Sequence, residues 1–322
     1  MSLINLKGII TSVFQLIRLP NILIIVLTQF LLRYSILNTF LYRSDPVAMS
    51  GIVDFSILVL VTVLIAMGGY VINDYFDIKI DSINKPDKLV VNRLISPRGA
   101  IKLHITLNVI AIILGFYLSY RIRVFSFGLI FPFLSGVLWL YSAKYKRMLL
   151  WGNLIVSLLS GFVILIVWLF EFFWLRLTPE LFSSVLPEIR WVTKAFLGYG
   201  LFAFLVSFFR EIIKDIEDAK GDETFGCSTL PLVVGVKNAR WMTAAVIVLT
   251  ILLLAYGQLI VYRLDWGMVF WYFTIAVQLP SLYLLFMLMK AKEKSDFHFL
   301  SLLCKLIMIA GILSMQLISI ST

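Results

Sequence analysis

Two short runs of acidic residues hold the side chains of this sequence that are best suited to chemistry. Ten of the 18 Asp and Glu residues lie in these runs. The first run contains Asp74, Asp77, Asp81 and Asp87, and the second contains Glu211, Asp215, Glu217, Asp218, Asp222 and Glu223. If each run lies on a helix, three of its carboxylates recur at positions i, i+3 and i+7 and share one helical face.

Oxygen ligands gathered in this way are typical of a divalent cation site. Two like-charged clusters that face one another repel unless cations neutralise them, and Mg²⁺ prefers one or two carboxylates together with phosphate oxygens. No stretch of the sequence resembles an EF-hand loop, which disfavours Ca²⁺. The alternative is that each run is a solvated helix end paired with nearby lysines. Two runs with matching spacing favour a Mg²⁺–diphosphate site.

The composition indicates which kind of fold must position these runs. Of 322 residues, 61% are hydrophobic and 14% are charged, and the mean hydropathy is +0.98. In soluble globular proteins roughly a quarter of the residues are charged, so this chain is predicted to lie in lipid. Two cysteines and two histidines give no metal-ligand spacing, which excludes a disulfide framework and disfavours a zinc or haem site.

The apolar stretches predict an all-α, polytopic membrane bundle around a central cavity. A bilayer core of about 30 Å needs roughly 20 apolar residues per helix, which gives about nine transmembrane helices. The predicted spans are residues 19–41, 52–73, 101–120, 124–143, 153–175, 192–213, 240–262, 268–288 and 299–320. The connections between them are short, so we expect a single transmembrane domain over residues 1–322.

Basic residues in the connections predict the orientation of the spans. With a cytoplasmic N-terminus, 19 of the 28 Lys and Arg residues fall in cytoplasmic segments and 8 on the opposite face. The positive-inside rule therefore predicts a multi-pass protein of the cytoplasmic (inner) membrane. Both acidic runs then lie at the cytoplasmic face, where we expect the active site. Because the bases follow membrane topology, we expect no nucleic-acid partner, and no obligate protein partner is evident.

The acidic runs resemble the two signatures of the UbiA superfamily of intramembrane prenyltransferases. The first signature is similar to Asn73-Asp74-x-x-Asp77-x-x-x-Asp81 followed by Asn84-Lys85-Pro86-Asp87, and the second to Lys214-Asp215-Ile216-Glu217-Asp218-x-x-x-Asp222. The resemblance covers nearly the whole chain, including the nine-span layout. It implies Mg²⁺-dependent transfer of a prenyl group from an isoprenyl diphosphate. The implied Mg²⁺ ligands are Asn73, Asp77, Asp81, Asp218 and Asp222, assisted by Asp74 and Asp215.

Basic and aromatic residues near the runs are candidates for handling the substrate. An allylic diphosphate ionises when metal ions and basic residues neutralise its leaving group, and aromatic rings stabilise the resulting carbocation. The family's Tyr-x-x-x-Lys element is matched imperfectly, because Tyr141 precedes Lys144 and Lys146 at offsets three and five. The predicted catalytic residues are Asp77, Asp81, Asp218, Asp222 and Tyr141. The predicted diphosphate-binding residues are Arg18, Asn21, Lys85, Arg93, Lys144, Lys146 and Arg210. For each base, positive-inside anchoring is the alternative.

The surroundings of the first run resemble the branch of the superfamily that prenylates geranylgeranylglyceryl phosphate, an ether-lipid precursor. The similar residues are Gly68-Gly69-Tyr70, Asn73 to Asp77, and Asn84-Lys85-Pro86. A phosphorylated lipid acceptor needs basic groups beside the metal site, which cytoplasmic lysines supply. One alternative is an aromatic acceptor of quinone biosynthesis, such as 1,4-dihydroxy-2-naphthoate or 4-hydroxybenzoate. Another is a cation transporter, which is disfavoured because transporter sites usually lie near the bilayer midplane.

Overall fold

The computed structural model describes residues 13–43, 49–84 and 90–321. This part of the chain is almost entirely helical, with no strand beyond an isolated bridge between Val91 and Ile95. Nine of the helices described are long and apolar enough to cross a membrane. The predicted all-α class and the nine spans are therefore confirmed, and the chain is a multi-pass membrane protein.

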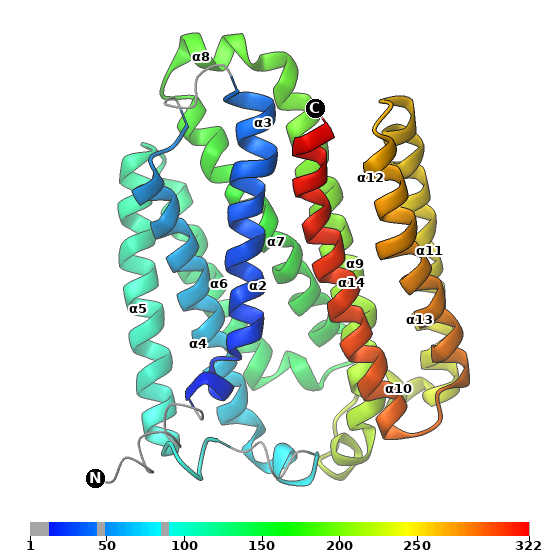
Figure 1. Ribbon diagram of the computed structural model, residues 1–322. Helices are drawn as coiled ribbons and strands as arrows, with labels where there is room; N and C mark the ends of the chain where they lie inside the picture. Colours follow the sequence, from blue (N-terminus) through cyan, green and yellow to red (C-terminus); the bar gives the residue numbers. More distant parts are fainter. Residues whose placement is uncertain (1–12, 44–48, 85–89, 322) are drawn as a thin grey trace, which may run out of the picture. The chain divides into compact units, whose positions relative to one another are not determined.

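The chain divides into two compact units. Unit 1 comprises Met1–Leu27 and Ser50–Arg147, and unit 2 comprises Thr28–Met49 and Met148–Thr322. The helices of unit 1 are the first turns of α2 (Leu19–Leu31), α4 (Ile52–Asn84), α5 (Pro97–Arg121), α6 (Phe125–Ala143) and the 3₁₀ turn η4 (Tyr145–Arg147). Helices α4, α5 and α6 pack against one another (Figure 1). This packing is what holds the first acidic run in place.

The contact between α4 and α5 depends on a glycine at the centre of α4. The carbonyl oxygen of Gly68 lies 2.8 Å from Nδ1 of His104, which donates to it. Asn108 stands one turn further along α5, and its Nδ2 donates to the His104 carbonyl at 2.8 Å. A Cβ on Gly68 would lie 2.5 Å from that Nδ2. The two helices therefore approach so closely that only a residue without a side chain fits.

Replacing Gly68 by alanine is expected to destabilise unit 1 by about 1–3 kcal/mol, because the added methyl must displace a hydrogen-bonded Asn108. Thermal unfolding in detergent measures the effect. Gly136→Ala in α6 is the matched control, since its Cβ would meet nothing within 4 Å. An equal loss of stability in both variants would mean that the close approach at Gly68 is not the cause.

Unit 2 is built around α9, the longest helix described. Its helices are η1 (Leu32–Leu37), α3 (Asn38–Leu41), α7 (Trp151–Leu175), α8 (Pro179–Ser184), α9 (Leu186–Thr224), α10 (Leu230–Val234), α11 (Val236–Arg263), α12 (Gly267–Tyr272), η5 (Phe273–Gln278), α13 (Leu279–Lys290) and α14 (Lys294–Ser321). Helix α9 packs against α7, α11 and α14. Val206, Phe209 and Ile213 of α9 form a buried core with residues of α11, α13 and α14.

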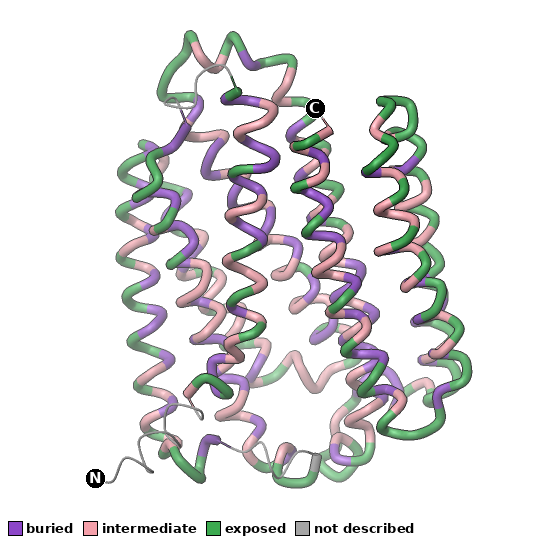
Figure 2. The backbone as a smooth tube through the Cα atoms, in the orientation of Figure 1, coloured by how far each residue is buried: buried purple, intermediate pink, exposed green. Residues whose placement is uncertain are grey.

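The outer faces of these helices are apolar and exposed, as lipid contact requires. On α11, Leu252, Tyr256 and Leu259 are more than half exposed and recur on one face at helical spacing. In Figure 2, exposed segments recur along α11 and α12, whereas buried segments recur along α9. In water such a face would be an aggregation site, whereas in a bilayer it is the normal surface of a spanning helix.

Both acidic runs lie on helices that extend beyond their apolar stretches. The predicted spans 52–73 and 192–213 stop where the charged residues begin, but α4 continues to Asn84 and α9 to Thr224. Helices of 33 and 39 residues are about 50 and 58 Å long. The condition for a shared carboxylate face, namely that each run lies on a helix, is therefore met in both.

Candidate functional site

The first acidic run projects from the last turns of α4. Asn73 and Asp77 are buried, with 7% and 2% of their surface exposed. The Asn73 Nδ2 donates to Oδ2 of Asp77 at 2.7 Å, as the i, i+4 spacing predicts. Asp81 follows one turn later and is half-buried. The run thus presents amide and carboxylate oxygens along one line of the helix, which is a donor set suited to Mg²⁺.

Arg18 makes an ion pair with this run. Its Nη2 lies 3.1 Å from Oδ1 of Asp74, and its guanidinium stacks 4.8 Å from the centre of the Tyr70 ring. Asn21, in the first turn of α2, donates to the Tyr70 hydroxyl at 3.4 Å. Arg18 itself adopts a φ of +53°, a conformation that costs a side-chain-bearing residue about 1–3 kcal/mol. These contacts hold Arg18 in that conformation beside the acidic run.

Lys146 is the second base of the run, and it contacts the Asp77 carboxylate directly. Lys146 comes from the 3₁₀ turn after α6, whereas Lys144 is the C-cap residue of α6. The structure therefore brings Lys146, at the fifth position after Tyr141, to the run. Arg147 was not among the predicted diphosphate-binding residues. It donates to the Phe76 carbonyl at 3.1 Å and connects the same turn to α4.

Both bases stay charged in these surroundings. Burial works against the charged form of Lys146, but Asp77 and then Tyr141 outweigh it, so the pKa of Lys146 lies above its ordinary value. Burial likewise opposes the charge of Arg18, and Asp74 and then Tyr70 raise the pKa of Arg18 nonetheless. The end of α4 thus carries carboxylates and permanent cations in one place.

The second acidic run lies on the last turns of α9 in unit 2. Asp215, Asp218 and Asp222 are half-buried. The Asn153 Nδ2 of α7 donates to Oδ2 of Asp215 at 2.8 Å. Asn153 was not among the predicted site residues, and its polar side chain at the start of the predicted span 153–175 was the signal that could have indicated a role. This hydrogen bond fixes the orientation of the Asp215 carboxylate.

Two glutamates of α9 organise the bases near this run. Oε1 of Glu211 accepts from Arg210 at 2.8 Å, and Oε2 of Glu211 accepts from Lys214 at 2.7 Å. Oε1 of Glu217 lies 2.9 Å from Nδ1 of His298 in α14. Arg210 is thus held beside the acidic run of its own helix.

The remaining predicted residues have less defined places. Arg93 lies with an exposed side chain in the turn that connects Val91 and Ile95. Lys85 and Asp87 lie outside the described residues. Within residues 13–43, 49–84 and 90–321, no three His, Cys, Asp or Glu side chains form a group that could hold a metal ion. The predicted ligands come as separate oxygen-donor sets, one in each unit, and their joint use of Mg²⁺ stays a prediction.

The sequence profile of the UbiA prenyltransferase family matches residues 39–304, which includes both acidic runs. The chain belongs to this family. A digeranylgeranylglyceryl phosphate synthase of Thermococcus sibiricus is 32% identical over 184 residues, which is 57% of this UbiA-family chain and 57% of that protein. The match therefore spans less than two thirds of that relative.

Two solved structures have the same fold as this UbiA-family protein. One, described as digeranylgeranylglyceryl phosphate synthase in membranes, superposes with a TM-score of 0.62 at 23% identity and covers 96% of this chain and 99% of that one. The other is a UbiA homologue from Archaeoglobus fulgidus bound to GPP and Mg²⁺, with a TM-score of 0.56 at 15% identity over 94% and 99% of the two chains. At these identities the likeness establishes the fold.

Proposed function

We propose that this protein is a Mg²⁺-dependent prenyltransferase that moves a prenyl group from an isoprenyl diphosphate to a phosphorylated glycerol lipid. The observation that carries the proposal is the end of α4, where Asp74 and Asp77 are held by Arg18 and Lys146. Oxygen ligands for a cation and permanent cations for an anion stand together there, which is what a metal–diphosphate complex requires. Family membership and the relative bound to GPP and Mg²⁺ support the same function.

Bound Mg²⁺ would neutralise charge on the diphosphate leaving group. The metal ligands of this chain would be Asn73, Asp77 and Asp81 on α4 and Asp218 and Asp222 on α9, with Asp74 and Asp215 assisting. In the proposed reaction Arg18, Asn21 and Lys146 orient the diphosphate and add positive charge to it, together with Lys85, Arg93, Lys144 and Arg210. The nearby ring of Tyr141 stabilises the allylic cation.

The similarity to the Thermococcus sibiricus protein supports a phosphorylated lipid as the acceptor, because the name of that synthase gives its product as a glyceryl phosphate lipid. The acceptor hydroxyl attacks the allylic carbon, a carbon–oxygen bond forms, and diphosphate leaves with the electron pair of the broken carbon–oxygen bond and takes up the proton that the hydroxyl releases. We place this reaction at the cytoplasmic face of the cytoplasmic membrane, because most Lys and Arg residues lie in the connections on that side. An aromatic acceptor is the alternative substrate of the same site.

A transfer assay in lipid vesicles tests this function. Purified protein is given radiolabelled geranylgeranyl diphosphate and geranylgeranylglyceryl phosphate, with 4-hydroxybenzoate as the competing acceptor. We expect prenylation of the phosphorylated lipid, loss of product in EDTA, and recovery when excess Mg²⁺ is added. Transfer to the aromatic acid alone would show that the acceptor is aromatic and that the proposed phosphorylated lipid is wrong. Failure to release diphosphate in a metal-dependent way would contradict the proposed prenyl transfer and favour cation transport.

A further inference from the structure

Two hydrogen bonds fix how α9 and α14 lie against each other within unit 2. Nδ1 of His298 lies 2.9 Å from Oε1 of Glu217, and the hydroxyls of Tyr199 and Ser314 are 2.7 Å apart. Residue numbers rise along α14 as they fall along α9, so the two helices are antiparallel. The same register places Lys305 of α14 level with Arg210 of α9.

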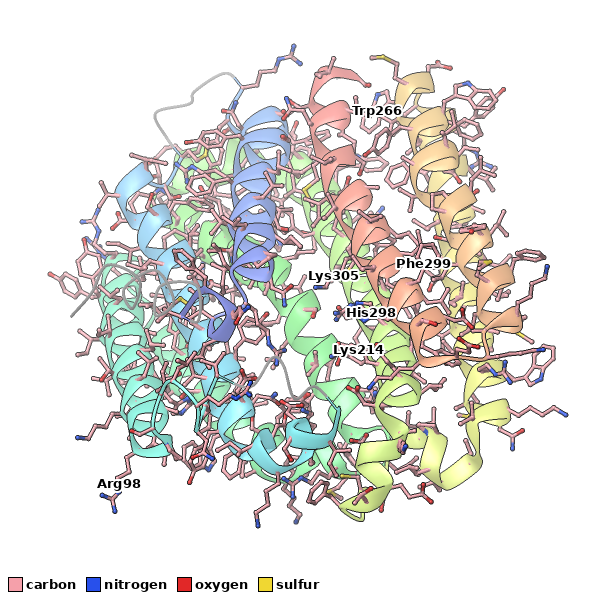
Figure 3. All side chains as sticks on the ribbon, turned by 60° about the horizontal axis from the view of Figure 1, so that its bottom comes forward. Arg98, Lys214, Trp266, His298, Phe299 and Lys305 are labelled. Carbon is pink, nitrogen blue, oxygen red and sulfur yellow. The ribbon has the colours of Figure 1, made fainter. Side chains whose placement is uncertain are left out.

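A line of basic side chains follows this helix pair. Lys214 of α9 lies level with the stretch of α14 between His298 and Lys305, and Figure 3 labels all three. We call these three residues the basic strip. His298 and Lys305 are seven residues apart on one face of α14, which separates them by about 10 Å along the helix. The strip therefore runs from the first turns of α14 toward the middle of the last membrane span.

The basic strip adjoins the second acidic run. At 3.6 residues per turn, Asp215, Asp218 and Asp222 occupy one arc of the α9 surface, and Lys214 lies at its edge. Asn153 of α7 contacts the opposite edge of that arc through Asp215. Within unit 2 the acidic run is thus flanked by an amide donor on one side and by the basic strip on the other.

A lysine within a membrane span calls for a function. Placing its charge at the centre of a spanning helix costs about 2.5–3.5 kcal/mol, and such residues are functional by default. The bases near the strip share two glutamates, because Glu211 accepts from both Arg210 and Lys214 and Glu217 lies beside His298. A phosphate dianion carries more charge and three acceptor oxygens, so it competes effectively with them.

We propose that Lys214, His298 and Lys305 bind the phosphate of the lipid acceptor. This proposal rests on the proposed prenyl transfer and specifies where its second substrate is held. The strip reaches into the span, as a headgroup whose chains remain in the bilayer requires. The donor diphosphate has its own bases, Arg18 and Lys146, on the first acidic run.

Kinetics with two acceptors test the basic strip. Lys305→Met and His298→Gln are assayed with geranylgeranylglyceryl phosphate and with the same lipid lacking its phosphate. We expect each variant to raise the KM for the phosphorylated acceptor by about tenfold, the loss of one charge-assisted contact. The KM for the donor and the rate with the dephosphorylated lipid should change less than about twofold. Lys305→Arg should restore most of the preference for phosphate.

Matched measurements separate the possible outcomes. Lys290→Met at the end of α13 is the control, because this exposed lysine stacks 4.0 Å from the centre of the Phe286 ring, on a helix that carries no acidic run. Thermal unfolding of each variant shows whether it is folded. Two results would overturn the proposal that the basic strip binds the acceptor phosphate. One is a parallel rise in the KM for the donor, and the other is an unchanged KM for the phosphorylated acceptor in a folded variant. If wild-type protein transfers no prenyl group to either lipid, the proposed function itself fails.

Discussion

Replacing Asp77 by asparagine is expected to lower the rate of prenyl transfer by about a thousandfold, the size of effect that follows loss of a group that stabilises charge in a transition state. Asp77 is the most buried of the three carboxylates of the first acidic run that the structure describes, and it accepts from both Asn73 and Lys146. The neutral amide removes one negative ligand of the proposed Mg²⁺ and turns a donor toward it. The single-turnover rate at saturating donor is the measurement.

The same helix offers a matched control for this variant. Asp54 of α4 is also buried, 3% exposed, and pairs with Arg121 at 2.8 Å, but it lies near the start of the helix, five turns before the acidic run. Asp54→Asn should lower thermal stability and leave the transfer rate within about threefold of wild type, because breaking a buried pair affects folding alone. If both variants lost activity equally, the loss would reflect disruption of α4, and the metal role of Asp77 would be refuted. Asp218→Asn tests the second run in the same way.

Replacing Lys146 by methionine is expected to lower kcat/KM for the donor by about a hundredfold, mainly through its KM. Lys146 is the base that contacts Asp77, and its charge is held by that carboxylate and by Tyr141. Losing a charge-assisted contact to the leaving group accounts for this magnitude. Initial rates over a range of donor concentrations, at fixed Mg²⁺, give both constants.

Lys144→Met is the natural comparison, since the two lysines could not be told apart in the sequence. Lys144 caps α6, and we expect its replacement to change kcat/KM by less than about fivefold. A larger effect at Lys144 than at Lys146 would contradict the assignment and would mean that the turn after α6 rearranges when the donor binds.

The sequence was sufficient for the parts of this protein that depend on local periodicity. Nine apolar stretches predicted nine spans, because each must satisfy its own backbone in lipid. The spacing of Asn73 and Asp77 predicted their shared helical face, and the hydrogen bond between them is the direct consequence. The ends of the spans were less certain, because hydropathy falls at the first charge while the hydrogen-bonded helix of α4 continues for a further three turns.

Contacts between distant segments could not be predicted in this way. Asn153 and Asp215 are 62 residues apart, and their meeting depends on which faces of α7 and α9 pack. The choice between Lys144 and Lys146 depends on where α6 ends and on the 3₁₀ turn that follows it. Neither the amino-acid composition nor the helical periodicity of the sequence indicates the left-handed backbone conformation of Arg18. Tertiary packing decides each of these.

The length of α4 and α9 has a consequence for how lipid properties act on the enzyme. A helix of about 50 Å exceeds a hydrocarbon layer of about 30 Å, so its acidic end reaches the headgroup region when its apolar part is matched to the bilayer. Thickening the membrane draws that end toward the hydrocarbon, and thinning it pushes the end toward water. We therefore expect the hydration of the proposed metal ligands, and with it the reaction rate, to depend on the acyl-chain length of the surrounding lipids.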